Sequence, residues 1–148
     1  QMKKIAISVG DLNGIGIEIA LKAHYEVCKL CTPIYCISPT LLKQSCKLLD
    51  VKIPDNFNLH HTDGDFKIQA GQINSSSGRY SYDSFINAIK LCETKQTDAV
   101  VTLPIHKEAW MRCGLDYKGH TDLLRKYFNK EAIMMLGCEK MYVALFTE

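Results

Sequence analysis

Apolar residues along the chain form short continuous runs, and longer stretches with helical spacing separate these runs. Each run is rich in Ile, Val or Ala and is bounded by Gly, Pro or turn-forming residues, which is typical of buried strands. The first predicted strands are KIAISVG at 4–10, PIYCIS at 33–38 and AVVTLP at 99–104. The predicted amphipathic helices lie at 14–30, 40–51 and 81–96. This alternation predicts an α/β domain with a mostly parallel sheet flanked by helices.

The pattern is weaker between Lys52 and Gly78. NLHHT and FKIQAG match only short strands there, and NSSSGRYS at 74–81 consists of turn-forming residues, which predicts a loop. We therefore expect the following helix to begin at Ser81 or Asp83. The remaining predicted elements are helices at 105–115 and 121–128 and strands at 132–137 and 141–147.

Length and composition indicate a globular domain with a substantial core. The 148 residues are 47% hydrophobic and 23% charged, and the formal net charge is only +2. A charge this small and scattered does not favour a nucleic-acid partner. No apolar run approaches the length of a membrane span, and Met2-Lys3-Lys4 leads into a short strand rather than a signal peptide. We therefore predict a cytoplasmic protein without a nucleic-acid or membrane partner.

Seven cysteines are dispersed along the chain, an odd number that does not suggest a disulfide framework. Cys28 and Cys31 form a CxxC pair, but a zinc ribbon needs a second such pair, which the other cysteines do not supply. We therefore expect buried, reduced thiols and no metal at this pair.

The final predicted strand reaches Thr147, next to the last residue of the sequence. An intact α/β domain normally ends in a turn, a helix or a polar tail. We therefore expect the sequence to be one part of a longer protein.

Two motifs join a predicted strand to a predicted helix. In GDLNGIG, at 10–16, backbone N–H groups could receive an anion, although the glycines can equally serve a tight turn. In TLPIHK, Lys107 follows the strand at 99–104 and could hold an anionic substrate. The alternative for Lys107 is a solvated residue in the first turn of a helix.

The motif GHTDLL combines several groups that suit binding. Gly119 permits an unusual backbone angle, and Thr121 can cap the helix that follows, so His120 would project from the loop ahead of that helix. An imidazole, a hydroxyl and a helix N-terminus together suit a small hydroxylated, phosphorylated molecule. The alternative is a simple cap with His120 on the surface.

Five separated motifs occur in an order that resembles the 4-hydroxythreonine-4-phosphate dehydrogenase family of vitamin B6 biosynthesis. They are GDLNGIGIEI, AGQINSSSG, DAVVTLPIHK, GHTDLL and MML…VALFT, and together they cover nearly the whole chain. The resemblance implies an isocitrate/isopropylmalate dehydrogenase-like fold. It also implies a two-domain enzyme of about twice this length, of which residues 1–148 are the N-terminal portion.

The resemblance also implies roles for single residues. His120 and Thr121 match the substrate-binding residues of the family's Gly-His-Thr-Glu motif, and Asp122 replaces the Glu of that motif. Asp122 and Lys107 are further candidate contacts to the substrate or its anionic group. The family's metal is held by three histidines, the first of which follows a Val-Ala-Leu-x-Thr strand that here ends at Thr147. No metal ligand is therefore expected within this chain.

The implied activity is oxidation of 4-hydroxythreonine-4-phosphate, a small phosphorylated hydroxy-amino acid, with NAD or NADP as the cofactor. The 3-oxo acid so formed decarboxylates to 3-amino-2-oxopropyl phosphate. A divalent metal (Zn, Mg or Co) and a homodimer are implied for the intact enzyme, whereas this chain alone is expected to be inactive. The alternatives are a dehydrogenase of threonate or erythronate 4-phosphate, and a non-catalytic phosphate-binding fragment.

Overall fold

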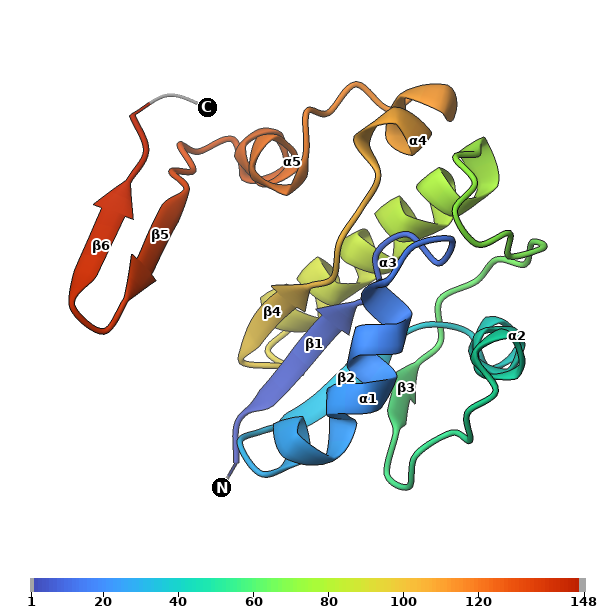
Figure 1. The fold of residues 1–148 in the computed structure, drawn as a ribbon. Helices are drawn as coiled ribbons and strands as arrows, with labels where there is room; N and C mark the ends of the chain where they lie inside the picture. The colour runs from blue at the N-terminus through green and yellow to red at the C-terminus, as the bar shows by residue number, and fades with distance from the viewer. Residues whose placement is uncertain (1, 147–148) are drawn as a thin grey trace. The chain divides into compact units, whose positions relative to one another are not determined.

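The computed structural model describes residues 2–146, and the chain divides after Gly114 into two compact units (Figure 1). The first unit contains a parallel sheet and four helices. The second unit contains one helix and a β-hairpin.

Four short strands form the sheet of the first unit, in the order β3-β2-β1-β4 with every neighbouring pair parallel. Ile7 of β1 is paired with Tyr35 of β2 on one side and with Val101 of β4 on the other. The strands are β1 (Lys4–Ser8), β2 (Thr32–Cys36), β3 (Asn58–His60) and β4 (Ala99–Thr102). The predicted α/β class and mostly parallel sheet are confirmed.

Helices cover both faces of this sheet at β1 and β2, where side chains alternate between the faces and both sets include buried apolar residues. The edge strand β4 is largely exposed, so the prediction of a buried strand at 99–104 is wrong. Ile7 and Tyr35 belong to a large apolar cluster with residues of α1 and α2. Ala6 and Cys36 pack instead with Ala88 of α3. Figure 1 shows α1 in front of the sheet and α3 behind it. The helices are α1 (Gly16–Cys28), α2 (Pro39–Leu49), α3 (Ser75–Glu93) and α4 (Lys107–Arg112).

The start of α3 differs from the prediction. The helix begins at Ser75, so the expected loop at 74–81 and the expected cap at Ser81 or Asp83 are wrong. The Asn74 side chain caps the helix by accepting a hydrogen bond from the Ser77 backbone N–H at 2.9 Å. Serine and glycine have low helix propensity, but contacts with the rest of the unit outweigh that preference here.

Of the two short strands expected between residues 52 and 78, only Asn58–His60 forms. FKIQAG has no regular strand geometry, because its backbone forms hydrogen bonds with side chains of other segments and not with a neighbouring strand of the described sheet. The Ile68 backbone N–H donates to the Gln44 side chain at 2.6 Å, and the Gln69 N–H donates to the Asn13 side chain at 2.8 Å.

The second unit consists of α5 (His120–Phe128) and an antiparallel hairpin of β5 (Met135–Cys138) and β6 (Met141–Ala144). The two strands expected at the end of the sequence are thus present, and they pair with each other. The predicted end of the last strand, at Thr147, lies outside the described residues. Of the helices formed by residues 2–146, none has the length and apolar character needed to cross a membrane.

Candidate functional site

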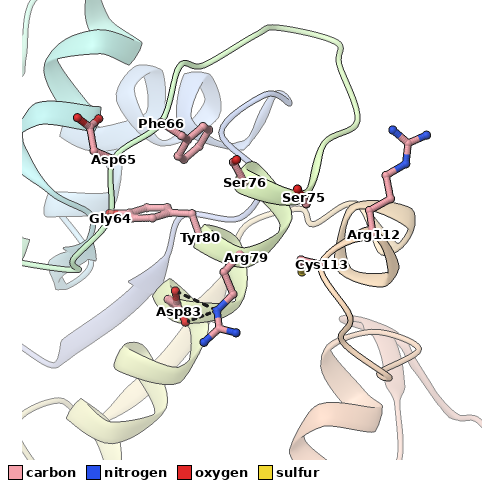
Figure 2. A pocket seen from close by; sticks show the side chains of 10 residues that line it. All are labelled: Gly64, Asp65, Phe66, Ser75, Ser76, Arg79, Tyr80, Asp83, Arg112 and Cys113. Atoms are coloured by element: carbon pink, nitrogen blue, oxygen red, sulfur yellow. Dashed lines mark hydrogen bonds and ion pairs between the residues drawn. The ribbon is translucent and has the colours of Figure 1, made fainter.

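A groove of about 550 Å³ crosses the first turns of α3 (Figure 2). Its volume falls in the range that small-molecule sites occupy. Two arginines lie at its rim, but both are paired within the protein. Arg79 contacts Asp83 at 3.2 Å, and Arg112 contacts Glu108 at 2.6 Å. Because these charges are matched, the groove does not by itself select an anionic ligand.

The loops that follow β1 and β4 lie at the carboxyl edge of the sheet, where ligands bind in open α/β sheets. They are in direct contact, since the Asp11 backbone N–H donates to the Pro104 carbonyl at 2.9 Å. Gly10 has a φ of 66°, and a Cβ atom at this position would be 2.2 Å from the Pro104 oxygen. The contact between the loops therefore requires glycine at position 10. This geometry supports the tight-turn interpretation of GDLNGIG.

The Asp11 carboxylate is buried beneath the turn, with only 5% of the residue exposed. It accepts hydrogen bonds from the Asn13 backbone N–H at 2.9 Å and from the Ser77 hydroxyl at 3.1 Å. Burial raises the pKa of the Asp11 carboxyl above its ordinary value, while these two bonds and the charge of His106 oppose the rise. The sequence signal for this residue is weak, since an Asp after a strand and a glycine is also an ordinary turn residue.

Asn13 joins the same turn to the segment that precedes α3. Its side-chain oxygen accepts from the Gln69 backbone N–H at 2.8 Å, and its amide group donates to the Gln72 carbonyl at 3.0 Å. Its backbone carbonyl accepts from the Gly71 N–H at 2.8 Å. The turn after β1 is thus bonded to the segment at 69–72 through Asn13, and to Ser77 and Pro104 through Asp11.

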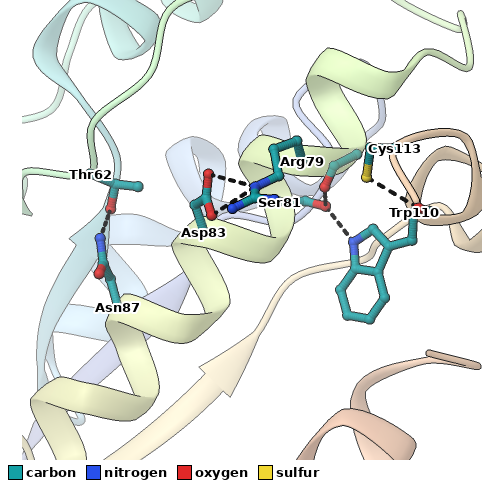
Figure 3. Close-up of polar contacts among 8 residues, drawn as sticks. Thr62, Arg79, Ser81, Asp83, Asn87, Trp110 and Cys113 are labelled. Carbon is teal, nitrogen blue, oxygen red and sulfur yellow. Dashed lines mark hydrogen bonds and ion pairs between the residues drawn. The ribbon is translucent and has the colours of Figure 1, made fainter. Parts of the chain in front are cut away.

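Lys107 begins α4, directly after the loop that follows β4. It is exposed, as is the neighbouring His106. The helix is anchored to α3 by Trp110, which is fully buried and whose indole N–H donates to the Ser81 hydroxyl at 2.7 Å (Figure 3). The first unit therefore presents Lys107 at the carboxyl edge of the sheet, on a short helix with a fixed core contact.

The GHTDLL motif lies in the second unit, at the start of α5. Gly119 is the N-cap and has a φ of 155°, a backbone conformation that favours glycine, as expected. The predicted Thr121 cap is wrong, because the helix begins at His120 and no side chain caps it. Gly119 turns the chain into the helix two residues earlier than a Thr121 cap would. His120 and Thr121 are therefore half-buried residues of the first turn.

Asp122 holds the loop ahead of α5. Its carboxylate accepts a hydrogen bond from the Lys118 backbone N–H at 3.0 Å and pairs with the Lys126 ammonium group at 3.2 Å. These contacts, the Lys118 bond foremost, hold the pKa of Asp122 below its ordinary value. A negative charge in the first turn also interacts favourably with the helix dipole. The carboxylate is thus engaged within the protein.

The described part of the chain, residues 2–146, contains no group of three His, Cys, Asp or Glu side chains arranged to hold a metal ion. The residues present therefore do not fit the metal that the family resemblance implies. All seven cysteines are free, but the expectation that they are buried is only partly correct. Cys36 and Cys46 are buried, Cys28 and Cys31 are half-buried, and Cys138 is exposed because it lies on the hairpin.

Comparison with known proteins finds relatives over the whole chain. The family model described as pyridoxal phosphate biosynthetic protein PdxA matches residues 29–148. The chain is 65% identical over 145 residues to the 4-hydroxythreonine-4-phosphate dehydrogenase of Sulfurimonas denitrificans, and 49% identical over 148 residues to that of Campylobacter fetus. These matches cover 98% and 100% of this chain, but only 47% and 48% of the two relatives. The chain thus spans about half the length of the curated relatives it matches.

A solved structure extends the comparison to the fold. The crystal structure of a 4-hydroxythreonine-4-phosphate dehydrogenase from Burkholderia phymatum matches with a TM-score of 0.83 at 23% identity, over 97% of this chain and 49% of that one. The isocitrate dehydrogenase-like fold implied by the family resemblance is therefore confirmed. Because the family model matches most of the sequence and the relatives agree with it, the chain belongs to the family of the pyridoxal phosphate biosynthetic protein PdxA.

Proposed function

We propose that the intact protein is an NAD-dependent dehydrogenase that oxidises 4-hydroxythreonine-4-phosphate in pyridoxal phosphate biosynthesis. The observation that supports this proposal most strongly is 65% identity, over 98% of the chain, to a relative named for that reaction. Residues 1–148 would supply the N-terminal portion of a two-domain enzyme. By themselves they are expected to be inactive.

The reaction removes a hydride from the carbon of the substrate's secondary alcohol and a proton from its hydroxyl group. The nicotinamide cofactor supplies the hydride acceptor. The product is a 3-oxo acid, which loses carbon dioxide to give 3-amino-2-oxopropyl phosphate. The protein's contribution is to hold the alcohol carbon and the hydride acceptor in a reactive geometry.

His120 and Thr121 are the proposed substrate-binding residues. Their imidazole and hydroxyl groups lie in the first turn of α5, where backbone N–H groups also favour an anionic ligand. They would act by positioning the substrate rather than by transferring protons. Asp122 would support them indirectly, since its bond to Lys118 holds the loop that leads to the start of the helix at His120. Lys107, on the first unit, is a further proposed contact for an anionic group.

Further properties of the intact protein are proposed on the family resemblance alone. It would use NAD or NADP, require Zn, Mg or Co, and act as a cytoplasmic homodimer. Because the described residues do not fit a metal site, the roles proposed for His120, Thr121 and Lys107 do not involve the metal.

The test is NADH formation from 4-hydroxythreonine-4-phosphate, NAD and a divalent metal, compared between residues 1–148 and the full-length protein. Turnover by the full-length protein alone is the expected result. Turnover of threonate or erythronate 4-phosphate instead would correct the substrate. Reversible phosphate binding without turnover of any of the three would reject the dehydrogenase function in favour of a binding role.

A further inference from the structure

Asp11 is a buried charged group that the proposed reaction does not use. A carboxylate removed from water destabilises a fold unless hydrogen bonds compensate for the lost hydration. Both oxygens of Asp11 have such a partner, and each partner belongs to a different part of the unit. One oxygen accepts from the Asn13 N–H at 2.9 Å, within the turn, and the other accepts from the Ser77 hydroxyl at 3.1 Å, in α3. The side chain therefore ties the turn after β1 to the start of α3.

The same turn after β1 also supports the loop that leads to Lys107. The Asp11 backbone N–H donates to the Pro104 carbonyl at 2.9 Å, three residues before Lys107. Gly16 also lies against this loop, since a Cβ atom there would be 3.0 Å from the Leu103 Cβ. The loop thus rests on the turn over several atoms. A change in the shape of the turn must therefore move the loop.

The other support of Lys107 lies further along α4. Trp110 fixes the helix to α3 through its indole N–H and its burial. Between β4 and α4, Pro104 and His106 are exposed, and the half-buried Leu103 packs against the apolar core. The position of Lys107, the first residue of α4, therefore depends on Trp110 from one side and, from the other, on the turn and on the core contact of Leu103.

We propose that Asp11 is a positioning residue of the substrate site: its carboxylate fixes the turn that supports the loop after β4, and thereby places Lys107 for contact with the anionic substrate. Asp11 itself does not touch the substrate. The inference rests on the proposed function, in which Lys107 binds an anionic group.

Steady-state kinetics of the full-length enzyme test this inference with two Asp11 variants. Asp11→Ala removes both acceptors and should raise the KM for the phosphorylated substrate by about tenfold, with a smaller change in kcat. Asp11→Asn keeps an acceptor for the Asn13 N–H, and its amide group can donate to the Ser77 hydroxyl. The KM of the Asp11→Asn variant should therefore stay near the wild-type value.

Ser84→Ala is the matched control. The Ser84 hydroxyl is also fully buried in the first unit, where it accepts from the Val9 N–H at 3.0 Å and donates to the Cys36 carbonyl at 2.7 Å. Its loss should lower the melting temperature without changing the KM. This control separates positioning from general loss of stability, which reduces the active fraction rather than substrate affinity.

A double-mutant cycle tests whether Asp11 acts through Lys107. Lys107→Ala should raise the KM, and adding Asp11→Ala should then have little further effect. A wild-type KM for Asp11→Ala, or full additivity with Lys107→Ala, would overturn the inference.

Ser77→Ala is the second variant, for use if Asp11→Ala does not fold. It removes one of the two bonds and should raise the KM to a smaller extent. An unchanged KM would count against the inference. Absence of turnover by the wild-type enzyme would instead reject the proposed function, so the two failures are distinguishable.

Discussion

Substitution of Gly78 by Ala examines how closely α3 and α4 approach each other. Gly78 lies on the buried face of α3, and an added Cβ atom would be 2.2 Å from the Ala109 carbonyl oxygen and 3.0 Å from the Ala109 Cβ. Ordinary van der Waals contact begins at 3.4 Å, so the two helices must separate by on the order of 1 Å. The obstructing oxygen belongs to the backbone and cannot rotate away.

Two opposing effects determine the change in the free energy of unfolding. Alanine is favoured over glycine in a helix interior by about 1 kcal/mol. Overpacking of a core contact costs about 1–3 kcal/mol. Separation of the helices also weakens the bond between Trp110 and Ser81, and such a bond contributes about 1 kcal/mol. We therefore expect a net loss of about 1–2 kcal/mol, opposite in sign to the helix propensity.

The assay is urea unfolding of the full-length protein, followed by circular dichroism, for the wild type, Gly78→Ala and Ser76→Ala. Ser76 is exposed on the same helix, so its replacement should leave stability unchanged or slightly higher. Emission from Trp110, the one tryptophan in these 148 residues, should also change in native Gly78→Ala. Wild-type stability with unchanged Trp110 emission would refute the close approach of the two helices.

Three further predictions concern single side chains. His120→Ala in the full-length enzyme should raise the KM for the substrate about tenfold or more, and an unchanged KM contradicts a binding role. The pKa of Asp122 lies below its ordinary 3.8, so its stabilising effect is present above that value and is lost as the pH falls through the lower, folded pKa. Asp122→Asn should therefore flatten the fall in melting temperature below about pH 4, and an unchanged profile argues against the Lys118 bond. In thiol labelling of the native protein, Cys138 should react well before Cys36, because burial raises the pKa of Cys36 to about 12, and equal rates contradict that burial.

The sequence by itself determined most of the fold. Runs such as KIAIS and AVVT predict strands because continuous apolar side chains suit a sheet covered on both faces, and both strands form. The burial predicted for AVVT is wrong, because β4 lies at the edge of the described sheet and is largely exposed. Helical spacing likewise predicts α1 and α2, since these helices bury one face against the sheet. The motifs predicted the family as well, because their order along the chain is a property of the sequence alone. The local sequence pattern is enough to predict a helix or strand wherever buried positions repeat with a regular period.

Only the tertiary structure decided where α3 begins and what the turn after β1 does. The residues at 75–78 form a helix because Asn74 caps them and because Gly78 lets α4 approach, and α4 is remote in the sequence. The Asp11 carboxylate accepts a hydrogen bond from Ser77, which lies 66 residues further along the chain. Its backbone N–H donates to Pro104, which lies further along still. Serine, glycine and aspartate are all ordinary turn residues, so their local preferences cannot reveal these contacts. Such contacts depend on how the loops after neighbouring parallel strands converge at one edge of the sheet, which is a property of the folded chain.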